Sequence, residues 1–258
     1  ISEAKEYLDG KKIKIAISGP AGLGVAEVAR LQFVQEVYAT FALVEDKEKD
    51  TEVVVELGGE DAKIIFLKGG VDERMNGTCA GGTGAFIDQM ASLLNVTPDE
   101  LDEMSLKCEK VYPIASRCGV FAKTDIQPLI NQGVSKNDIA ASIYMAVVNQ
   151  TIAGLAQGRK IKGKVMFLGG PLFYNKGLRK AFKDTLKLSD EEAIFPEYSL
   201  YAVALGASIF ASQSDKVYQY NTLIEKLEEA VKAKREVACM PALFASDDEL
   251  KEFKERHD

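Results

Sequence analysis

The spacing of apolar residues predicts strands and amphipathic helices that follow one another along the chain. We expect a helix over residues 1–10, a strand over 12–18, a loop over 19–24 and a long helix over 26–43. Two β-branched runs on either side of a Gly-Gly pair predict a β-hairpin over 53–67. The first half of the chain therefore combines helices with at least one hairpin.

The second half carries clearer helix signals. Thr97 followed by Pro98 is typical of a helix start, and Ser135 opens a helix that we expect to reach about residue 158. A strand is predicted over 164–168, and helices are predicted over 175–186, within 197–210, over 221–236 and after the Ser-x-x-Glu box at Ser246. The predicted buried stripe of the long helix is Ile139, Ile143, Ala146, Val147, Thr151 and Leu155.

The segment 75–94 joins a turn, a cysteine and three glycines to an amphipathic helix. Cys79 precedes that helix, where the first N–H groups and the helix dipole stabilise negative charge, so its thiol should ionise easily and bind metal well. Gly81, Gly82 and Gly84 let the backbone approach a bulky anion, as glycines do around phosphates. The segment thus offers a soft metal ligand beside a phosphate site.

Cys118 repeats this arrangement, because it also precedes a predicted helix. Iron–sulfur clusters usually take four cysteines, so two chains of a symmetric dimer could supply two each. The alternative is that Cys79 and Cys118 are buried free thiols that pack as small apolar groups, since their spacing is unlike Cys-x-x-Cys. Cys108 lies in a predicted loop, where we expect a structural role.

The predicted hairpin carries charged residues around its turn. Glycine N–H groups can bind phosphate, and a carboxylate at a strand end can hold Mg²⁺ or orient a water molecule. The alternative is a charged surface hairpin, which an acidic residue inside an apolar strand makes less favourable at Glu56. The residues concerned are Glu56, Gly58, Gly59, Glu60, Asp61 and Lys63.

Three further positions have weaker signals. Gly169 and Gly170 follow a buried strand, which is a place for a nucleobase or ribose to lie against backbone. The glycines of 19–24 lack both the third glycine of a dinucleotide motif and the ending of a P-loop, so we favour a plain strand-to-helix turn there. Glu36 inside a predicted helix belongs to a solvated face or has a specific partner.

Composition limits the possible partners and locations. The chain has 258 residues, 47% of them hydrophobic and 28% charged, with a net charge of -7 that argues against nucleic acid or an acidic membrane surface. We see neither an apolar run of about 20 residues nor a signal peptide, and four cysteines without close pairing fit a reducing compartment. We therefore expect a cytoplasmic protein without a membrane partner. His257 is the single histidine, which leaves no histidine-based catalysis.

Three pieces occur in an order that resembles a known family. They are Glu-Leu-Gly-Gly-Glu-Asp-Ala-Lys ending at Lys63, Asn-Gly-Thr-Cys-Ala-Gly-Gly-Thr-Gly ending at Gly84, and Cys118 followed by Gly-Gly-Pro ending at Pro171. Together they resemble the activator ATPases of 2-hydroxyacyl-CoA dehydratases and the related subunits of benzoyl-CoA reductase. These proteins belong to the superfamily of actin, Hsp70 and the acetate and sugar kinases.

The resemblance covers about residues 11–212 and implies a fold. It implies an α/β protein of two ribonuclease-H-like lobes, with nucleotide between them and a boundary near 75–95. We therefore expect an ATPase domain over 1–212 and a helical linker toward a further domain over 213–258. The family opens with an Asp-x-Gly-Ser/Thr phosphate hairpin that has no counterpart here. We thus expect an incomplete N-terminal lobe and a chain cut from a longer protein.

The resemblance also implies the site. Cys79 and Cys118 match the two cysteines per subunit that hold one [4Fe–4S] cluster at a dimer interface. ATP or ADP with Mg²⁺ would lie behind it. The implied catalytic residues are Glu56, Glu60 and Asp61, and the implied nucleotide-binding residues are Gly58, Gly59, Lys63, Gly81, Gly82, Thr83, Gly84, Gly169, Gly170 and Pro171.

The implied activity is ATP-driven electron transfer in an anaerobic metabolism. A ferredoxin or flavodoxin would load the cluster of a homodimer, and the electron would pass at low potential to a dehydratase or reductase component. Glu56 and Glu60 stand where the family usually has Asp and Gln, and an added negative charge beside phosphate weighs against hydrolysis. Two alternatives stay open: a sugar or acyl kinase with Asp61 or Glu56 as base, and a domain that binds cluster or partner without turnover.

Overall fold

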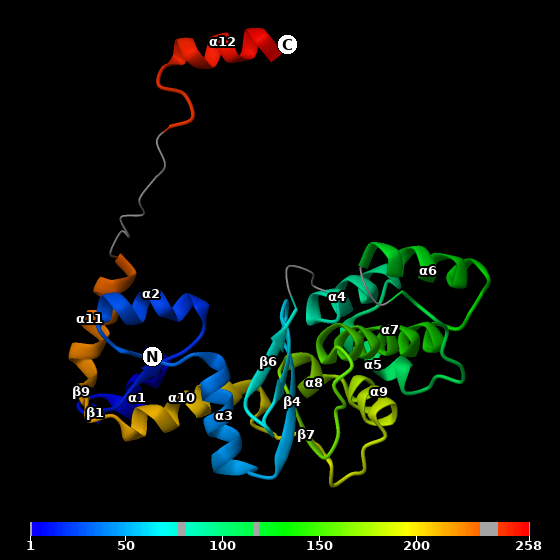
Figure 1. Cartoon of the computed structure of the whole chain (residues 1–258), viewed down its shortest axis with the longest axis horizontal. Helices are drawn as coiled ribbons and strands as arrows, with labels where there is room; N and C mark the ends of the chain where they lie inside the picture. Colours follow the sequence, from blue (N-terminus) through cyan, green and yellow to red (C-terminus); the bar gives the residue numbers. More distant parts are fainter. Residues whose placement is uncertain (1, 77–80, 116–118, 233–241, 258) are drawn as a thin grey trace.

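A five-stranded mixed sheet is the centre of the fold in the computed structural model, which describes residues 2–76, 81–115, 119–232 and 242–257. The strand order is β6-β5-β4-β7-β8, and Figure 1 labels β6, β4 and β7 of this sheet. β4 (Thr51–Leu57), β5 (Ala62–Phe66) and β6 (Asp72–Met75) are antiparallel neighbours, while β7 (Lys164–Leu168) and β8 (Ala193–Ile194) continue the sheet in parallel. The predicted hairpin and the predicted strand over 164–168 are therefore confirmed.

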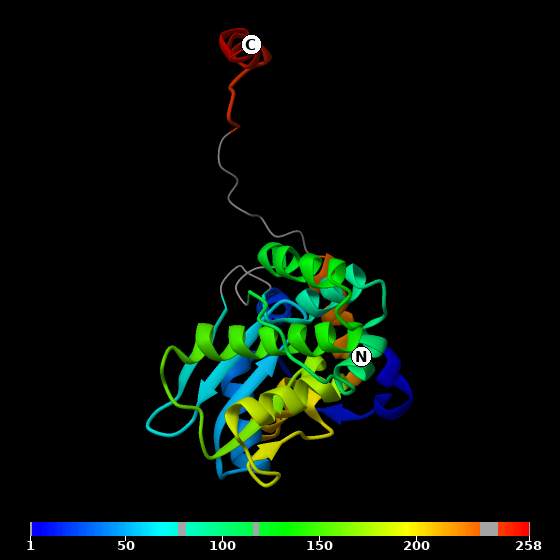
Figure 2. The ribbon, with the colours of Figure 1, turned by 90° about the vertical axis from the view of Figure 1, so that its right-hand side faces the viewer.

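Helices between β6 and β8 cover one face of this sheet. They are α4 (Gly84–Leu93), α5 (Pro98–Ser105), α6 (Gly119–Asn131), α7 (Lys136–Thr151) with its π-helical continuation η2 (Ile152–Ala156), α8 (Gly170–Tyr174) and α9 (Lys176–Leu186). Figure 2 shows α7 lying over the strands. The predicted stripe of α7 is buried in the main core that these helices share with the sheet.

Lys136–Ala156 is long and apolar enough to cross a membrane by length and composition, contrary to our expectation. However, 67% of its apolar window is buried inside the protein, as in the core helix of a globular domain. The predicted helix start at Thr97 is confirmed, and Thr97 forms a capping box with Glu100, in which each side chain is bonded to the other residue's N–H.

The opposite face of the sheet is covered by α3 (Glu36–Lys47) and α10 (Ala202–Gln213). The short 3-10 helix η3 (Ser199–Tyr201) leads directly into α10. Side chains alternate along β4, so Val53 and Val55 face the main core while Val54 faces a second, smaller core under α3 and α10. A Cβ on Gly206 would lie 1.8 Å from the Ala39 carbonyl oxygen. A glycine is therefore required for the close packing of α10 on α3.

The N-terminal residues build a smaller unit. β1 (Lys12–Ile13) pairs with β9 (Tyr218–Gln219), and β2 (Ala16–Ile17) pairs with β3 (Gln32–Phe33). α2 (Pro20–Ala29) and α11 (Tyr220–Lys232) pack together in a third core, after the short η1 (Ser2–Ala4) and α1 (Lys5–Leu8). Within the described residues, the sheets of this unit have two strands each.

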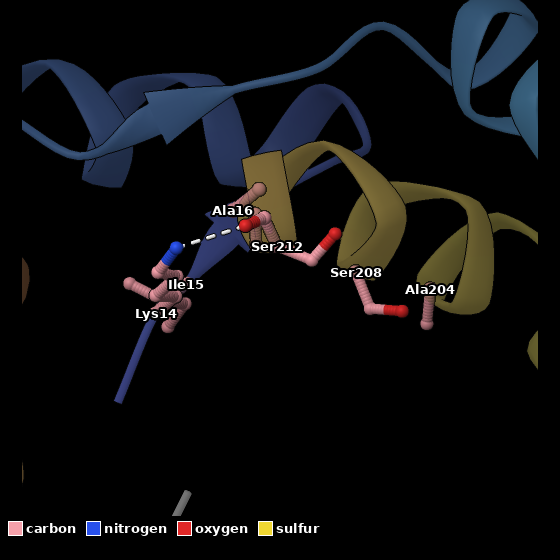
Figure 3. Close-up of a pocket in the computed structure, with 7 residues that line it drawn as sticks. Lys14, Ile15, Ala16, Ala204, Ser208 and Ser212 are labelled. Carbon is pink, nitrogen blue, oxygen red and sulfur yellow. Dashed lines mark hydrogen bonds between the residues drawn. The ribbon is translucent and has the colours of Figure 1, made fainter. Parts of the chain in front are cut away.

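A pocket of about 380 Å³ lies beside β2. It is lined by the β2 segment and by small side chains of α10, and Lys14 closes one side by donating to the Ser212 carbonyl over 2.9 Å (Figure 3). The predicted strand over 12–18 is thus two short strands that belong to different sheets. β2 has β3 on one edge and this pocket near the other.

The predicted loop over 19–24 and the predicted helix over 26–43 are wrong. α2 already begins at Pro20 and ends at Ala29, and its C-cap Arg30 has a left-handed backbone with φ 52°. Gly22 lies inside α2, where a Cβ would come 2.4 Å from the Ile17 side chain. This glycine serves helix–strand packing rather than a loop, and β3 separates α2 from α3.

The cores describe how segments near the expected boundaries pack. α4 belongs to the core of the unit built on the five-stranded sheet. β9 and α11, within the expected linker, pack on the N-terminal unit. α12 (Asp247–His257) has the predicted Ser246–Glu249 cap, where the Glu249 N–H donates to Ser246 over 3.3 Å.

Candidate functional site

The turn of the β4–β5 hairpin rests on the N-terminus of α4. The Gly84 N–H donates to the Gly58 carbonyl over 3.0 Å, and the Ala85 N–H donates to the Gly59 carbonyl over 2.7 Å. These two amides belong to the first helical turn, where N–H groups have no partner within the helix. The structure thus brings the two predicted glycine motifs together, and the hairpin carbonyls take the α4 amides that we expected to face phosphate.

Gly84 is the point where three sequence motifs meet. A Cβ on Gly84 would lie 3.3 Å from the Gly58 carbonyl oxygen, from Gly59 Cα and from Pro171 Cγ. The hairpin, the α4 glycine segment and the Gly-Gly-Pro segment are therefore in contact, although they are not neighbours in the sequence. A side chain at Gly84 would push these segments apart.

Asn76 fixes the other side of the hairpin turn. Its Oδ1 accepts from the Ala62 N–H over 2.7 Å, and its Nδ2 donates to the Glu60 carbonyl over 3.2 Å. Its backbone N–H also donates to the Ala62 carbonyl over 3.0 Å. The sequence marked Asn76 only as the start of a motif, and its contacts now show that it holds the turn.

Gly169 closes the end of β7 against β4. Its φ is 94°, and a Cβ would lie 2.0 Å from the Leu57 carbonyl oxygen, so a glycine is required on both grounds. The Gly169 N–H donates to Ser199 Oγ over 3.0 Å. Ser199 was missed by sequence reasoning, because a serine 30 residues away carries no local signal of this contact.

Glu56 and Lys63 are Cα partners on β4 and β5. Lys63 Nζ forms an ion pair with Glu36, the first residue of α3. Glu36 therefore has a specific partner, so the alternative of a solvated face is wrong. Glu56 Oε2 is buried and has no hydrogen-bond partner in the described part of the chain.

Burial controls the charges of this pair. Burial raises the pKa of Glu56 above its ordinary value, although the nearby Lys63 acts in the opposite direction. Burial alone would lower the pKa of Lys63, but Glu56 and Glu36 outweigh it and raise that pKa. Lys63 therefore stays protonated and positively charged, whereas Glu56 holds its proton more tightly than a free carboxyl group.

The remaining nucleotide candidates lie around this turn. Glu60 and Asp61 are exposed at its tip, where the Asp61 carbonyl accepts the Gly58 N–H over 2.7 Å. Gly82 has φ 85° and approaches Gln150 on α7, while Thr83 is fully buried at the start of α4. Gly81 lines a pocket of about 300 Å³ on the α7 side.

A pocket of about 210 Å³ opens between α4, α5 and α8. Gly170 and Pro171 form one wall, and Gly84 forms another. Tyr174 and Asp99 stand at its rim and are exposed. This pocket adjoins the meeting point of the three motifs and has room for part of a nucleotide.

The predicted metal ligands Cys79 and Cys118 lie outside the described residues. The described residue that follows Cys118, Gly119, packs on α4, since its Cβ would be 2.9 Å from Gln89 Oε1 and 3.8 Å from Phe86 Cδ2. Cys108 lies in a loop, as predicted, and is half-buried. Among the described residues, we find no group of three or more His, Cys, Asp or Glu side chains that could hold a metal ion.

Comparison with known proteins agrees with this arrangement. The BadF/BadG/BcrA/BcrD ATPase family matches residues 8–211. The chain belongs to this family. The resemblance inferred from the three motifs is therefore confirmed.

Individual relatives of the family support the fold. The (R)-2-hydroxyglutaryl-CoA dehydratase activating ATPase of Acidaminococcus fermentans is 35% identical over 160 residues, 61% of this chain and 60% of the relative. The crystal structure of component A of that dehydratase, from the same organism, matches with a TM-score of 0.70 at 29% identity, over 79% of this chain and 77% of that one.

The activator of the 2-hydroxyisocaproyl-CoA dehydratase from Clostridium difficile, solved with bound ADPNP, matches with a TM-score of 0.66 at 25% identity. That match covers 87% of this chain and 78% of that one. The predicted actin-like and Hsp70-like α/β fold class is thus confirmed. The chain spans about three fifths of the length of the curated relatives it matches.

We predict that Gly169→Ala destabilises the family's Gly-Gly-Pro segment strongly. The added methyl group would clash with the Leu57 carbonyl at a backbone angle that favours glycine, so the free energy of unfolding should fall by about 3 kcal/mol. Gly170→Ala is the matched control, because a Cβ there meets nothing within 4 Å, and it should change stability by less than about 0.5 kcal/mol. Urea denaturation measures both, and equal losses would contradict the assignment.

We predict that Glu56→Gln stabilises the protein at neutral pH but not at acid pH. Because the folded state raises the pKa of Glu56 above 4.5, proton loss opposes folding, and stability from this group is lost as pH rises through the raised pKa. The glutamine variant has no proton to lose, so its stability does not fall in this way. The stability difference between Glu56→Gln and wild type, measured by thermal denaturation, should be largest near pH 8 and vanish below pH 4.5. A gain that grows toward acid pH would contradict this.

Proposed function

We propose that this chain binds ATP or ADP and acts as the nucleotide-responsive part of an activator of an acyl-CoA dehydratase or reductase component. The observation that carries the proposal is the meeting of the hairpin turn, the α4 glycine segment and Gly-Gly-Pro at Gly84. The relatives named above are activators of CoA dehydratases, and one of them was solved with ADPNP.

The described residues fit a nucleotide with Mg²⁺. The hairpin turn is held from both sides, by α4 and by Asn76, so its backbone presents a fixed surface to phosphate. The exposed carboxylates of Glu60 and Asp61 are hard oxygen ligands of the kind that Mg²⁺ takes beside phosphates. The pocket beside Pro171 would take the adenosine side of the nucleotide.

Hydrolysis makes a further demand on Glu56. A carboxylate that holds Mg²⁺ or orients an attacking water must be charged and within reach of it. Glu56 is largely buried, with a raised pKa and with Lys63 across the strand pair. These facts favour nucleotide binding with slow turnover in this chain.

We also propose that Cys79 and Cys118 ligate a [4Fe–4S] cluster shared with a second copy of the chain. Such a cluster supplies one-electron chemistry, and a ferredoxin or flavodoxin in the cytoplasm would reduce it. The support is the position of both thiols ahead of α4 and α6 in the sequence, together with the packing of Gly119 on α4. This chain would contribute the thiolates and a nucleotide site next to them.

We predict that calorimetric titration with ADP and Mg²⁺ shows binding that depends on the hairpin turn. Asn76→Ala removes two side-chain hydrogen bonds from the turn and should weaken ADP binding by about tenfold. Asn221→Ala, on the exposed side of α11, is the control and should bind like wild type. Absence of ADP binding in the wild-type protein would refute the proposed function.

We predict about four irons per two chains after anaerobic reconstitution. Cys79→Ala should lose the cluster and its visible absorption, because the thiolate ligand is removed. Cys108→Ala is the matched control and should keep both, since Cys108 lies in a loop after α5. Iron and sulfide analysis checks this, and equal iron in wild type and Cys79→Ala would show that the ligand assignment is wrong.

A further inference from the structure

Glu56 and Lys63 form a polar layer at one end of the second core. They share a face of the sheet with Val54 and Ile65, because side chains alternate along each strand. Val54 and Ile65 pack under α3 and α10. Lys63 is therefore a cation on the α3 side of the hairpin, two residues from Asp61 in the turn.

Lys63 holds α3 to the sheet through its ion pair with Glu36. The Lys63 side chain is 8% exposed and the Glu36 side chain is 32% exposed. The carboxylate is thus the partner that can move into water, while the ammonium stays buried. An unpaired buried ammonium is costly, so Glu36 is expected to leave only when another anion takes its place.

Glu56 does not replace Glu36 as a hydrogen-bond partner of Lys63. Glu56 is the strand partner of Lys63, but its Oε2 is buried without a hydrogen-bond partner in the described part of the chain, so the polar layer is not satisfied by its own residues. Glu36 begins α3, where the helix dipole stabilises its charge even without Lys63. The cost of releasing Glu36 is therefore small compared with the cost of leaving Lys63 unpaired.

We propose that the phosphate groups of a nucleotide at the hairpin turn compete with Glu36 for Lys63, so that nucleotide binding releases the start of α3 from β5. A phosphate carries more charge than a carboxylate and offers more acceptor oxygens to one ammonium. This inference rests on the proposed nucleotide binding. It makes Glu36 a positioning residue that links α3 to the nucleotide site.

The test compares ATP and adenosine binding in the wild-type chain and in Glu36→Gln. The variant keeps the shape of Glu36 but no longer competes for Lys63, so ATP should bind about threefold to tenfold more tightly while adenosine binding stays the same. Amide hydrogen exchange in α3 should rise on ATP addition to wild type. The variant should show that raised exchange without nucleotide.

Two further variants control the measurement. Glu36→Asp keeps the charge and should keep ATP affinity near wild type. Glu52→Gln breaks a different ion pair of the same sheet, Lys68–Glu52 at 2.7 Å, and should change neither affinity nor α3 exchange. If Glu36→Gln bound ATP with the same affinity as wild type, the proposed competition between phosphate and Glu36 would be wrong. An equal change in the affinities for ATP and adenosine would contradict it as well.

A different result would bear on the proposed function alone. If the wild-type chain bound neither ATP nor adenosine, the proposed nucleotide binding would be wrong, and the proposed competition for Lys63 would be wrong as well. Exchange in nucleotide-free Glu36→Gln would still show whether this ion pair holds α3 to the sheet, because that measurement needs no ligand. The two failures are therefore distinguishable.

Discussion

The contact between the hairpin turn and the N-terminus of α4 is the constraint on which the candidate site depends. Two carbonyls of the turn accept from Gly84 and Ala85, which satisfies two amides that a helix start leaves without partners. The same contact sets how close Pro171 can come to Gly84. Two backbone hydrogen bonds and the absence of a side chain at Gly84 thus allow the three segments to meet.

Sequence reasoning was most successful where the signal is local. The hairpin, α7 and the α5 cap were predicted because β-branched runs, helical periodicity and capping residues act over a few positions. Gly169 was singled out because it follows a buried strand, and its left-handed backbone with φ 94° explains why a glycine stands there. What each glycine contacts could not be predicted, because those contacts join residues that are distant in sequence.

The errors have the same origin. The apolar residues that follow the start of α2 predicted one helix over 26–43. In the structure α2 stops before Arg30 and β3 pairs with β2, a contact that the local sequence does not show. The sequence predicted Gly22 to be a loop residue, but in the structure it is a helical residue that packs against the Ile17 side chain. Non-local pairing overrides local propensity in each case.

The polar layer at Glu56 and Lys63 is difficult to explain by stability alone. Burying a carboxyl group and an ammonium costs desolvation, and well-packed apolar residues at the same places are often at least as stable. Here the layer also leaves Glu56 Oε2 unsatisfied and pairs Lys63 with a partly exposed carboxylate at the start of α3. The buried ammonium lies next to the turn, on the side where α3 meets the sheet, and its carboxylate partner can move into water. This arrangement favours a role in sensing an anion over a role in packing.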